Sequence, residues 1–210
     1  MTTVKRQRRQ IDKDDARSTE TRILDAARTT FSSKGFFPTS VEEIAEGAQV
    51  SRATVYLYYR SKEEILFGLM REDLEHQLDR YRALAGMPRL SLTAVKTWLR
   101  EFRAAMDERR TSLNLFWVGA SIDPQWSEPV RDHRESIIAI LGERYPGFSL
   151  EGLSGATRET KRTRCYLTIL LIESVVCFAE PMSAAKLPVG IDVLGRGLLN
   201  FFETGEISIA

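Results

Sequence analysis

Residues 39–62, with the sequence TSVEEIAEGAQVSRATVYLYYRSK, carry side chains that could recognise a DNA duplex. An arginine can form two hydrogen bonds with the edge of a guanine, and a threonine offers a hydroxyl and a methyl group. Tyrosine hydroxyls and a lysine ammonium can bind phosphate oxygens and fix the register of a protein on DNA. The stretch contains all of these types within a few turns: Arg52, Thr54, Tyr56, Tyr58, Tyr59 and Lys62.

Two short helices joined by a tight turn would position these side chains. Thr39 and Glu42 have the spacing of a capping box at the start of a first helix, which Gly47 and Gln49 would end. Ser51 can cap a second helix. In a helix-turn-helix, the first residues of the second helix contact base edges in the major groove, and Arg52 and its neighbours occupy those positions here.

The same pattern also fits a small globular unit without a DNA function, in which the tyrosines are half-buried core residues. Residues 51–62 hold three basic and no acidic side chains, but residues 1–80 hold 14 of each. The net charge of the whole chain is +1. This near-neutrality excludes a long-range field that would attract nucleic acid, so DNA affinity would have to come from a local patch.

The chain as a whole is predicted to be all-α, because no stretch shows sustained period-two alternation of apolar and polar residues. Residues 1–17 are charged and lack apolar periodicity, which favours a disordered basic arm. The helix that begins near Ser61 is predicted to continue until Gly86, about 36 Å, so it can leave a small N-terminal unit and join a second one. The other predicted helices span 19–34, 91–110, 111–123, 127–145, 156–180 and 189–203.

Cysteine usage and hydropathy indicate the compartment. Cys165 and Cys177 lie 12 residues apart in one predicted helix, so about 18 Å separates them and an intramolecular disulfide is excluded. They are predicted to be small core residues in a reducing compartment. The basic N-terminus has no apolar stretch of a signal peptide behind it, and the apolar run 165–179 is short and interrupted by Glu173. We therefore expect a soluble cytoplasmic protein that does not associate with membranes.

A more specific signal lies in residues 22–70, RILDAARTTFSSKGFFPTSVEEIAEGAQVSRATVYLYYRSKEEILFGLM. It combines an Ala-Ala-Phe helix, Gly-aromatic, Thr-Ser-Val-x-x-Ile-Ala, Val-Ser-x-x-Thr-Val-Tyr-x-Tyr-Tyr and Ser-Lys-Glu-Glu in a fixed order. This order resembles the DNA-binding domain of the tetracycline-repressor (TetR) family. The resemblance covers about a quarter of the chain at the level of motifs, and the rest matches the family only in architecture.

The resemblance implies an N-terminal three-helix helix-turn-helix DNA-binding domain over residues 18–64. It also implies a C-terminal helical domain for ligand binding and dimerisation over residues 65–210. Bases would be contacted by the start of the second helix of the motif, and phosphates by the tyrosines, the lysine and the start of the first helix. The implied DNA-binding residues are Thr39, Ser40, Ser51 (mainly a cap), Arg52, Ala53, Thr54, Tyr56, Tyr58 and Lys62. Tyr59 is predicted to be a core residue with its hydroxyl at the edge.

Family members are typically homodimers that release a palindromic DNA operator when a small molecule enters the C-terminal domain. The candidate dimer helices here are 156–180 and 189–203. The second carries three glycines, and close approach of another helix would offset their cost of about 1 kcal/mol each; packing within one chain is the alternative. The predicted dimer face is the apolar stripe of Ile191, Leu194, Leu198, Phe201 and Phe202.

Aromatic side chains in the middle helices could line a pocket for a mostly apolar effector, although such stripes are also typical of an ordinary core. They are Trp98, Phe102, Phe116, Trp117, Trp126 and Phe178. Glu173 lies inside an apolar run, where an unpaired carboxylate costs several kcal/mol. It could meet a cationic ligand or an arginine of a dimer partner, or it could bond a neighbouring hydroxyl or arginine of its own chain.

Two other classes of function compete with DNA binding. An enzyme is disfavoured because His76 and His133, the two histidines, lie in no recognisable nucleophile or zinc motif. We therefore expect no catalytic site, bound metal or cofactor. A helical protein-interaction module without DNA binding is the other alternative, and the ordered motifs of residues 22–70 argue against it.

Overall fold

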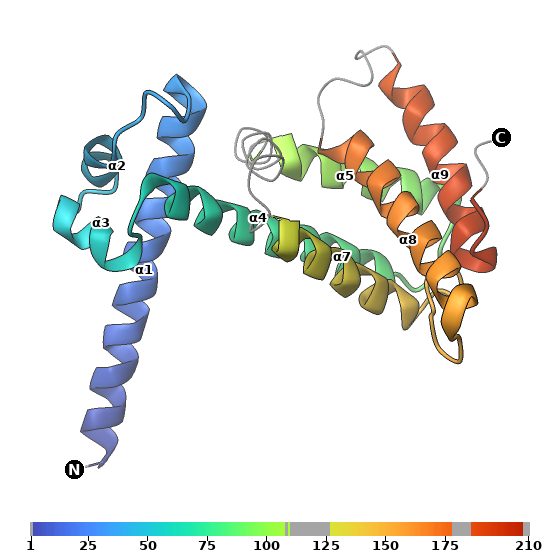
Figure 1. The fold of residues 1–210 in the computed structure, drawn as a ribbon, viewed down its shortest axis with the longest axis horizontal. Helices are drawn as coiled ribbons and strands as arrows, with labels where there is room; N and C mark the ends of the chain where they lie inside the picture. Colours follow the sequence, from blue (N-terminus) through green and yellow to red (C-terminus); the bar gives the residue numbers. More distant parts are fainter. Residues whose placement is uncertain (1, 108, 110–126, 178–185, 208–210) are drawn as a thin grey trace. The chain divides into compact units, whose positions relative to one another are not determined.

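The computed structural model describes residues 2–107, 109, 127–177 and 186–207, with side chains from Ser18 onward. Within these ranges every regular element is a helix (Figure 1), which confirms the predicted all-α class. None of the described helices is both long and apolar enough to cross a membrane. The helix predicted over 111–123 lies outside the described residues. The helices are α1 (Thr2–Lys34), α2 (Val41–Gly47), α3 (Arg52–Tyr58), α4 (Lys62–Ala85), α5 (Leu92–Asp107), α7 (Ser127–Gly142), α8 (Gly155–Val176) and α9 (Leu187–Thr204).

The chain divides into two compact units, residues 1–71 and 72–210. The first unit contains α1, α2, α3 and the start of α4. Its boundary falls at residue 71 rather than at 64, because the first turns of α4 place Ile65 and Leu69 in the core of this unit. Both side chains are fully buried, as are Ile23, Ala27, Ile44 and Val55 from the three preceding helices.

The N-terminal segment differs from the expectation of a disordered arm, since α1 already begins at Thr2. Residues 2–17 contain neither glycine nor proline and are rich in arginine, lysine and glutamine, all of which favour helix. The end of α1 agrees with the prediction. Gly35 has a φ of 88°, and its N–H donates to the Phe31 carbonyl at 3.0 Å, which is the left-handed conformation that favours glycine after a helix.

The second unit packs α5 against both α8 and α9, and α7 against α8 (Figure 1). Tyr81, Trp98 and Phe102 form an aromatic cluster in its core, with ring centroids 5.3–5.6 Å apart. Cys165 and Cys177 are buried free thiols, as predicted for small core residues. Burial raises the pKa of Cys165 to about 11, so this thiol stays protonated and unreactive at neutral pH.

His133 of α7 makes the stability of the second unit sensitive to acid. It is 5% exposed, and neither ring nitrogen has a hydrogen-bond partner among the described residues. Desolvation, and then the charge of Arg134, lower the pKa of the imidazole from 6.5 to about 4. The folded state disfavours the protonated ring. The unfolding free energy of the second unit is therefore at its full value above pH 6.5 and declines as the pH falls towards 4.

We predict that His133→Leu removes this loss of stability. Relative to the variant, the wild type should lose about 2 kcal/mol of unfolding free energy between pH 7.5 and 5, as expected for a pKa difference of about 2.5 units. Urea unfolding at both pH values measures the difference, and subtraction of the two proteins cancels the other titrating groups. An equal pH dependence of both proteins would contradict the assignment.

Candidate functional site

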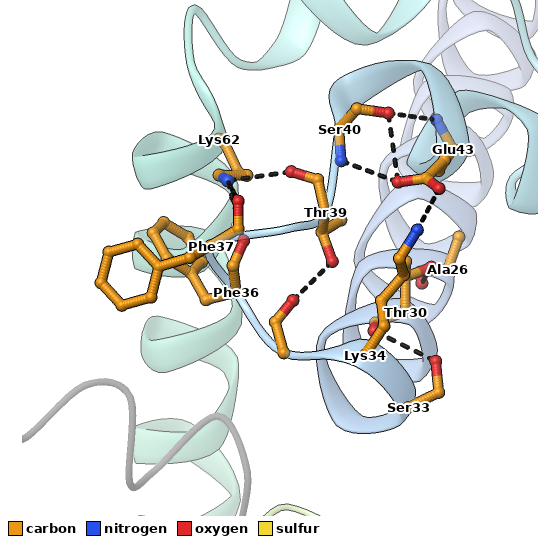
Figure 2. Close-up of polar contacts among 11 residues, drawn as sticks. Ala26, Thr30, Ser33, Lys34, Phe36, Phe37, Thr39, Ser40, Glu43 and Lys62 are labelled. Atoms are coloured by element: carbon orange, nitrogen blue, oxygen red, sulfur yellow. Dashed lines mark hydrogen bonds and ion pairs between the residues drawn. The ribbon is translucent and has the colours of Figure 1, made fainter.

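The helix pair α2–α3 is built as the sequence predicts, but α2 starts one residue later than expected. Its N-cap is Ser40, whose hydroxyl accepts the Glu43 N–H at 3.3 Å while the Ser40 N–H donates to the Glu43 carboxylate at 2.9 Å (Figure 2). The capping box is therefore Ser40 with Glu43, not Thr39 with Glu42. Lys34 also binds Glu43, and this contact, followed by the Ser40 N–H, lowers the pKa of the carboxyl to about 2.

Thr39 does not occupy the surface position that a phosphate contact needs. It is 3% exposed, and its hydroxyl donates to the Gly35 carbonyl at 2.6 Å (Figure 2). The Thr39 side chain therefore does not have the predicted DNA role in this structure. Its hydrogen bond instead stabilises the loop between α1 and α2. Ser40 is half-buried, and its hydroxyl serves the capping box.

The turn between α2 and α3 depends on a residue in an unusual conformation. Gln49 has a φ of 55°, a region that a side chain with a Cβ disfavours by about 1–2 kcal/mol. Arg22 of α1 holds the turn in place by donating to the Gln49 carbonyl at 2.9 Å and to the Ala48 carbonyl. The α1–α2–α3 arrangement is therefore locked through main-chain carbonyls.

Gln49→Gly should stabilise the first unit by about 1 kcal/mol, because glycine adopts a positive φ without steric cost. The side chain of Gln49 is exposed, so little packing is lost. A higher midpoint of thermal unfolding would verify the prediction. A lower midpoint would show that the left-handed turn carries no strain.

Helix α3 presents one face to the outside and anchors the other. Ser51 is its N-cap, accepting the Thr54 N–H at 2.9 Å, which confirms the predicted cap. Val55 is fully buried. Tyr59, just after the helix, is 4% exposed and donates its hydroxyl to Glu20 of α1 at 2.9 Å, as predicted for a core residue with its hydroxyl at the edge.

The exposed face of α3 carries most of the predicted base-contacting residues. Arg52, Ala53 and Tyr56 are exposed, whereas Thr54 and Tyr58 are half-buried. The Arg52 guanidinium contacts two neighbouring side chains. It donates to the Tyr56 hydroxyl at 3.3 Å, lies 5.3 Å from the Tyr56 ring centre, and forms an ion pair with Glu42 at 2.6 Å. The hydrogen bond to Tyr56, followed by the charge of Glu42, raises the pKa of Arg52.

Glu42 is the neighbour of Arg52 that the sequence pattern did not single out. Its position in the first turn of a helix suggested only a capping partner. The signal that could have pointed to it is its acidic charge in the first turn of α2, the helix that precedes Arg52 and α3.

Lys62 has an internal role in this structure, and its predicted phosphate contact stays a prediction. Its ammonium donates to the carbonyls of Phe36, Phe37 and Thr39 at 2.8, 3.0 and 2.8 Å, and lies 4.5 Å from the centre of the Phe36 ring (Figure 2). An ammonium has three N–H groups, and all three are used. Lys62 therefore ties the start of α4 to the loop between α1 and α2.

Lys62→Ala should lower the unfolding free energy of the first unit by about 1–3 kcal/mol, because it leaves three carbonyls without a charged donor. Lys34→Ala is the matched control. It removes another lysine near the same loop, but from an ion pair that is exposed to solvent and therefore stabilises the fold less. Thermal unfolding compares the two variants, and equal losses would contradict the internal role of Lys62.

The residues predicted for the dimer face lie mainly in the core. Ile191, Leu198, Phe201 and Phe202 are each at most 3% exposed within a single chain. Gly195 faces inward as well, since a Cβ there would lie 3.1 Å from a side-chain carbon of Lys96 on α5. This stripe of α9 packs within the chain against α5 and the residues after α7, while Leu194, Leu198 and Phe201 also line an apolar groove between α8 and α9. Its role as a dimer face stays a prediction, and Leu194 alone of the five is half-buried.

The predicted pocket residues are partly described. Trp98 and Phe102 are buried in the aromatic cluster with Tyr81. Glu173 is 4% exposed and accepts a hydrogen bond from Arg134 of α7 at 2.8 Å, so it pairs with an arginine of its own chain. Burial nevertheless raises the pKa of Glu173, opposed by Arg134. Phe116, Trp117, Trp126 and Phe178 lie outside the described residues.

Known proteins share both the helix pair and the overall arrangement. Residues 23–69 match the sequence profile described as "Bacterial regulatory proteins, tetR family". This segment is therefore similar to the N-terminal domain of the TetR family. The chain is also similar to the transcriptional regulator UidR of Escherichia coli, with 38% identity over 68 residues. That match covers 32% of this chain and 35% of UidR, so it concerns about a third of either protein.

Two comparisons extend over most of this chain. The transcriptional repressor Rv1474c of Mycobacterium tuberculosis is 28% identical over 186 residues, which cover 88% of this chain and 95% of that protein. The structure of GusR from Salmonella enterica superposes with a TM-score of 0.64 at 24% identity, covering 88% and 95% of the two chains. The match to GusR shows a shared fold, and the family match of residues 23–69 shows a segment similar to those of bacterial regulatory proteins.

Proposed function

We propose that the protein is a cytoplasmic transcriptional repressor that binds a palindromic DNA operator as a homodimer and is released by a small, mostly apolar effector. The observation that carries the DNA-binding part is the exposed face of α3, with Arg52 and Ala53 at its N-terminal end and Tyr56 one turn further on. The buried residues Val55 and Tyr59 hold the opposite face against the first unit. This arrangement suits insertion of α3 into a major groove.

A groove between α8 and α9 supports the homodimer. It has a volume of about 450 Å³, and its lining is almost entirely apolar. On α9 the lining residues Gly190, Val193, Leu194 and Gly197 follow helical spacing, and Leu171 and Ser174 line it from α8. Val189, another lining residue on α9, is 64% exposed, and Leu167 and Leu170 of α8 are also exposed apolar side chains.

A second copy of the chain is the occupant that fits this groove. In a twofold dimer the same face of both copies forms the interface, so one self-complementary face is sufficient. The small residues Gly190, Ser174 and Gly197 allow the backbones of facing helices to approach closely. An exposed apolar face of this kind marks an interaction site rather than an ordinary surface.

The DNA-binding part is tested with duplexes enriched by the wild-type protein from a randomised library. We expect a palindromic consensus, and we expect Arg52→Ala to lose about 1–3 kcal/mol at a single base pair of each half-site. Fluorescence anisotropy on the enriched duplex and its single-pair variants measures this loss. Failure of the wild type to enrich any sequence would contradict the function.

The dimer is tested with Val193→Asp, which places a charge in the groove. We expect sedimentation to show a monomer, and operator affinity to fall because each copy then holds only one half-site. Ala139→Asp, an equal charge on an exposed position of α7 away from the groove, is the control and should remain dimeric. Dimers in both variants would exclude this face as the interface.

A further inference from the structure

The ion pair between Arg52 and Glu42 joins the first turn of α3 to the first turn of α2. Glu42 Oε1 accepts from Arg52 Nη1 at 2.6 Å, and the Tyr56 hydroxyl accepts from Nη2 at 3.3 Å. The side chains of both ion-pair partners are more than half exposed. The capping box of α2 uses Glu43, so the carboxylate of Glu42 is not needed to start the helix.

The geometry of a guanidinium allows these contacts and base recognition at the same time. Arginine has five N–H groups, two on each Nη and one on Nε. Glu42 and Tyr56 take one N–H from each Nη, so one N–H on each Nη and the Nε–H remain. Two neighbouring N–H groups are enough for the paired hydrogen bonds to a guanine edge. A guanidinium already held in one plane also loses less rotational freedom on binding.

The carboxylate has a second effect on DNA binding. A lone arginine on α3 could bind any phosphate, which gives affinity without sequence preference. Glu42 neutralises Arg52 locally and repels phosphates itself. Both effects weaken binding to every duplex, while the fixed plane favours the one base pair that matches it. Discrimination often depends on such a repulsive element.

We propose that Glu42 is a positioning residue for base recognition by Arg52, increasing discrimination at the base pair that Arg52 contacts while lowering affinity for DNA of any sequence. This inference rests on the proposed DNA-binding function. It assigns to α2 a share in sequence recognition that does not require Glu42 to touch a base.

The test compares Glu42→Ala and Glu42→Gln with Glu46→Ala on three DNA duplexes. The first is the duplex enriched by the wild type, the second carries a single base-pair change at the position that Arg52→Ala identifies, and the third has a random sequence. Glu46 is an exposed acidic residue one turn further along α2, so Glu46→Ala removes the same charge from the same helix. Fluorescence anisotropy at fixed ionic strength gives the affinity ratio between the first two duplexes, and circular dichroism confirms folding.

We expect Glu42→Ala to bind the random duplex about 3- to 10-fold more tightly, because one repelling charge is gone. Its discrimination ratio should fall at least about fivefold, because Arg52 is no longer held. Glu42→Gln should gain affinity but keep most of the ratio, since its amide oxygen still accepts from Nη1. Glu46→Ala should leave the ratio unchanged. In an Arg52→Ala background, Glu42→Ala should cause no further loss of discrimination.

Two results would overturn the inference while the proposed function stands: a wild-type ratio in Glu42→Ala, or an equal fall of the ratio in Glu46→Ala. Absence of sequence-specific binding by the wild-type protein would instead contradict the proposed function. The two failures are thus distinguishable in one set of titrations.

Discussion

Arg134→Leu is expected to lower the unfolding free energy of the second unit by about 3–5 kcal/mol, the usual effect of removing one partner of a buried ion pair. Arg134 and Glu173 are both largely buried, with side-chain exposures of 16% and 5%. Their contact at 2.8 Å joins α7 to α8. Without Arg134, the carboxylate of Glu173 would remain in an apolar environment with its main positive neighbour removed.

The double variant Arg134→Leu/Glu173→Leu separates this explanation from a simple loss of packing. It removes the stranded charge, so it should recover most of the stability that the single variant loses. Relative to the double variant, the single variant should recover as the pH falls, because its Glu173 has a raised pKa and becomes neutral; this comparison cancels the titration of His133. Urea unfolding at pH 7.5 and 5.5 measures both effects. A double variant no more stable than Arg134→Leu would contradict the account.

Gly147→Ala should destabilise the second unit by at least about 3 kcal/mol, because the added methyl would overlap main-chain atoms of another helix. A Cβ at Gly147 would lie 1.7 Å from the carbonyl oxygen of Phe201 on α9. The Gly147 N–H donates to the Phe202 carbonyl at 2.9 Å. The loop after α7 therefore runs directly against the C-terminal turns of α9, and neither backbone can yield as a side chain would.

Gly152→Ala is the control for this prediction. Gly152 belongs to the same loop and has a positive φ of 69°, but a Cβ there would meet nothing within 4 Å. It should cost only the conformational penalty of about 1 kcal/mol. Chemical unfolding of both variants distinguishes backbone overlap from conformational strain, and similar losses would show that the loop can move away from α9.

The sequence predicts the helices and the helix pair well, because helical periodicity and caps are local properties. It is ambiguous at the start of α2, where Thr39 with Glu42 and Ser40 with Glu43 satisfy the same spacing one residue apart. Which of the two residues caps α2 depends on the buried hydrogen bond from the Thr39 hydroxyl to the Gly35 carbonyl. Local sequence patterns do not encode this contact. The extension of α1 to Thr2 was missed for a related reason, since charged sequences are typical of both helices and disordered arms.

The partners of individual side chains are predicted less well. A lysine at position 62 offers three N–H donors. Their acceptors are main-chain carbonyls of the loop between α1 and α2, and main-chain carbonyls have no sequence signature. The stripe of α9 was predicted to be a dimer face, but periodicity does not say whether another helix of the same chain or of a second copy covers it. Ile191 and Phe201 pack inside the chain, while Val193 belongs to the exposed groove.

The groove between α8 and α9 ties the folding of this protein to how much of it is present. If a second copy covers the groove, each doubling of concentration shifts the equilibrium toward the folded pair by mass action, and the temperature of unfolding rises with it. A cell that makes few copies then holds a less heat-resistant protein than one that makes many. Thermal tolerance becomes a property of expression level as well as of sequence.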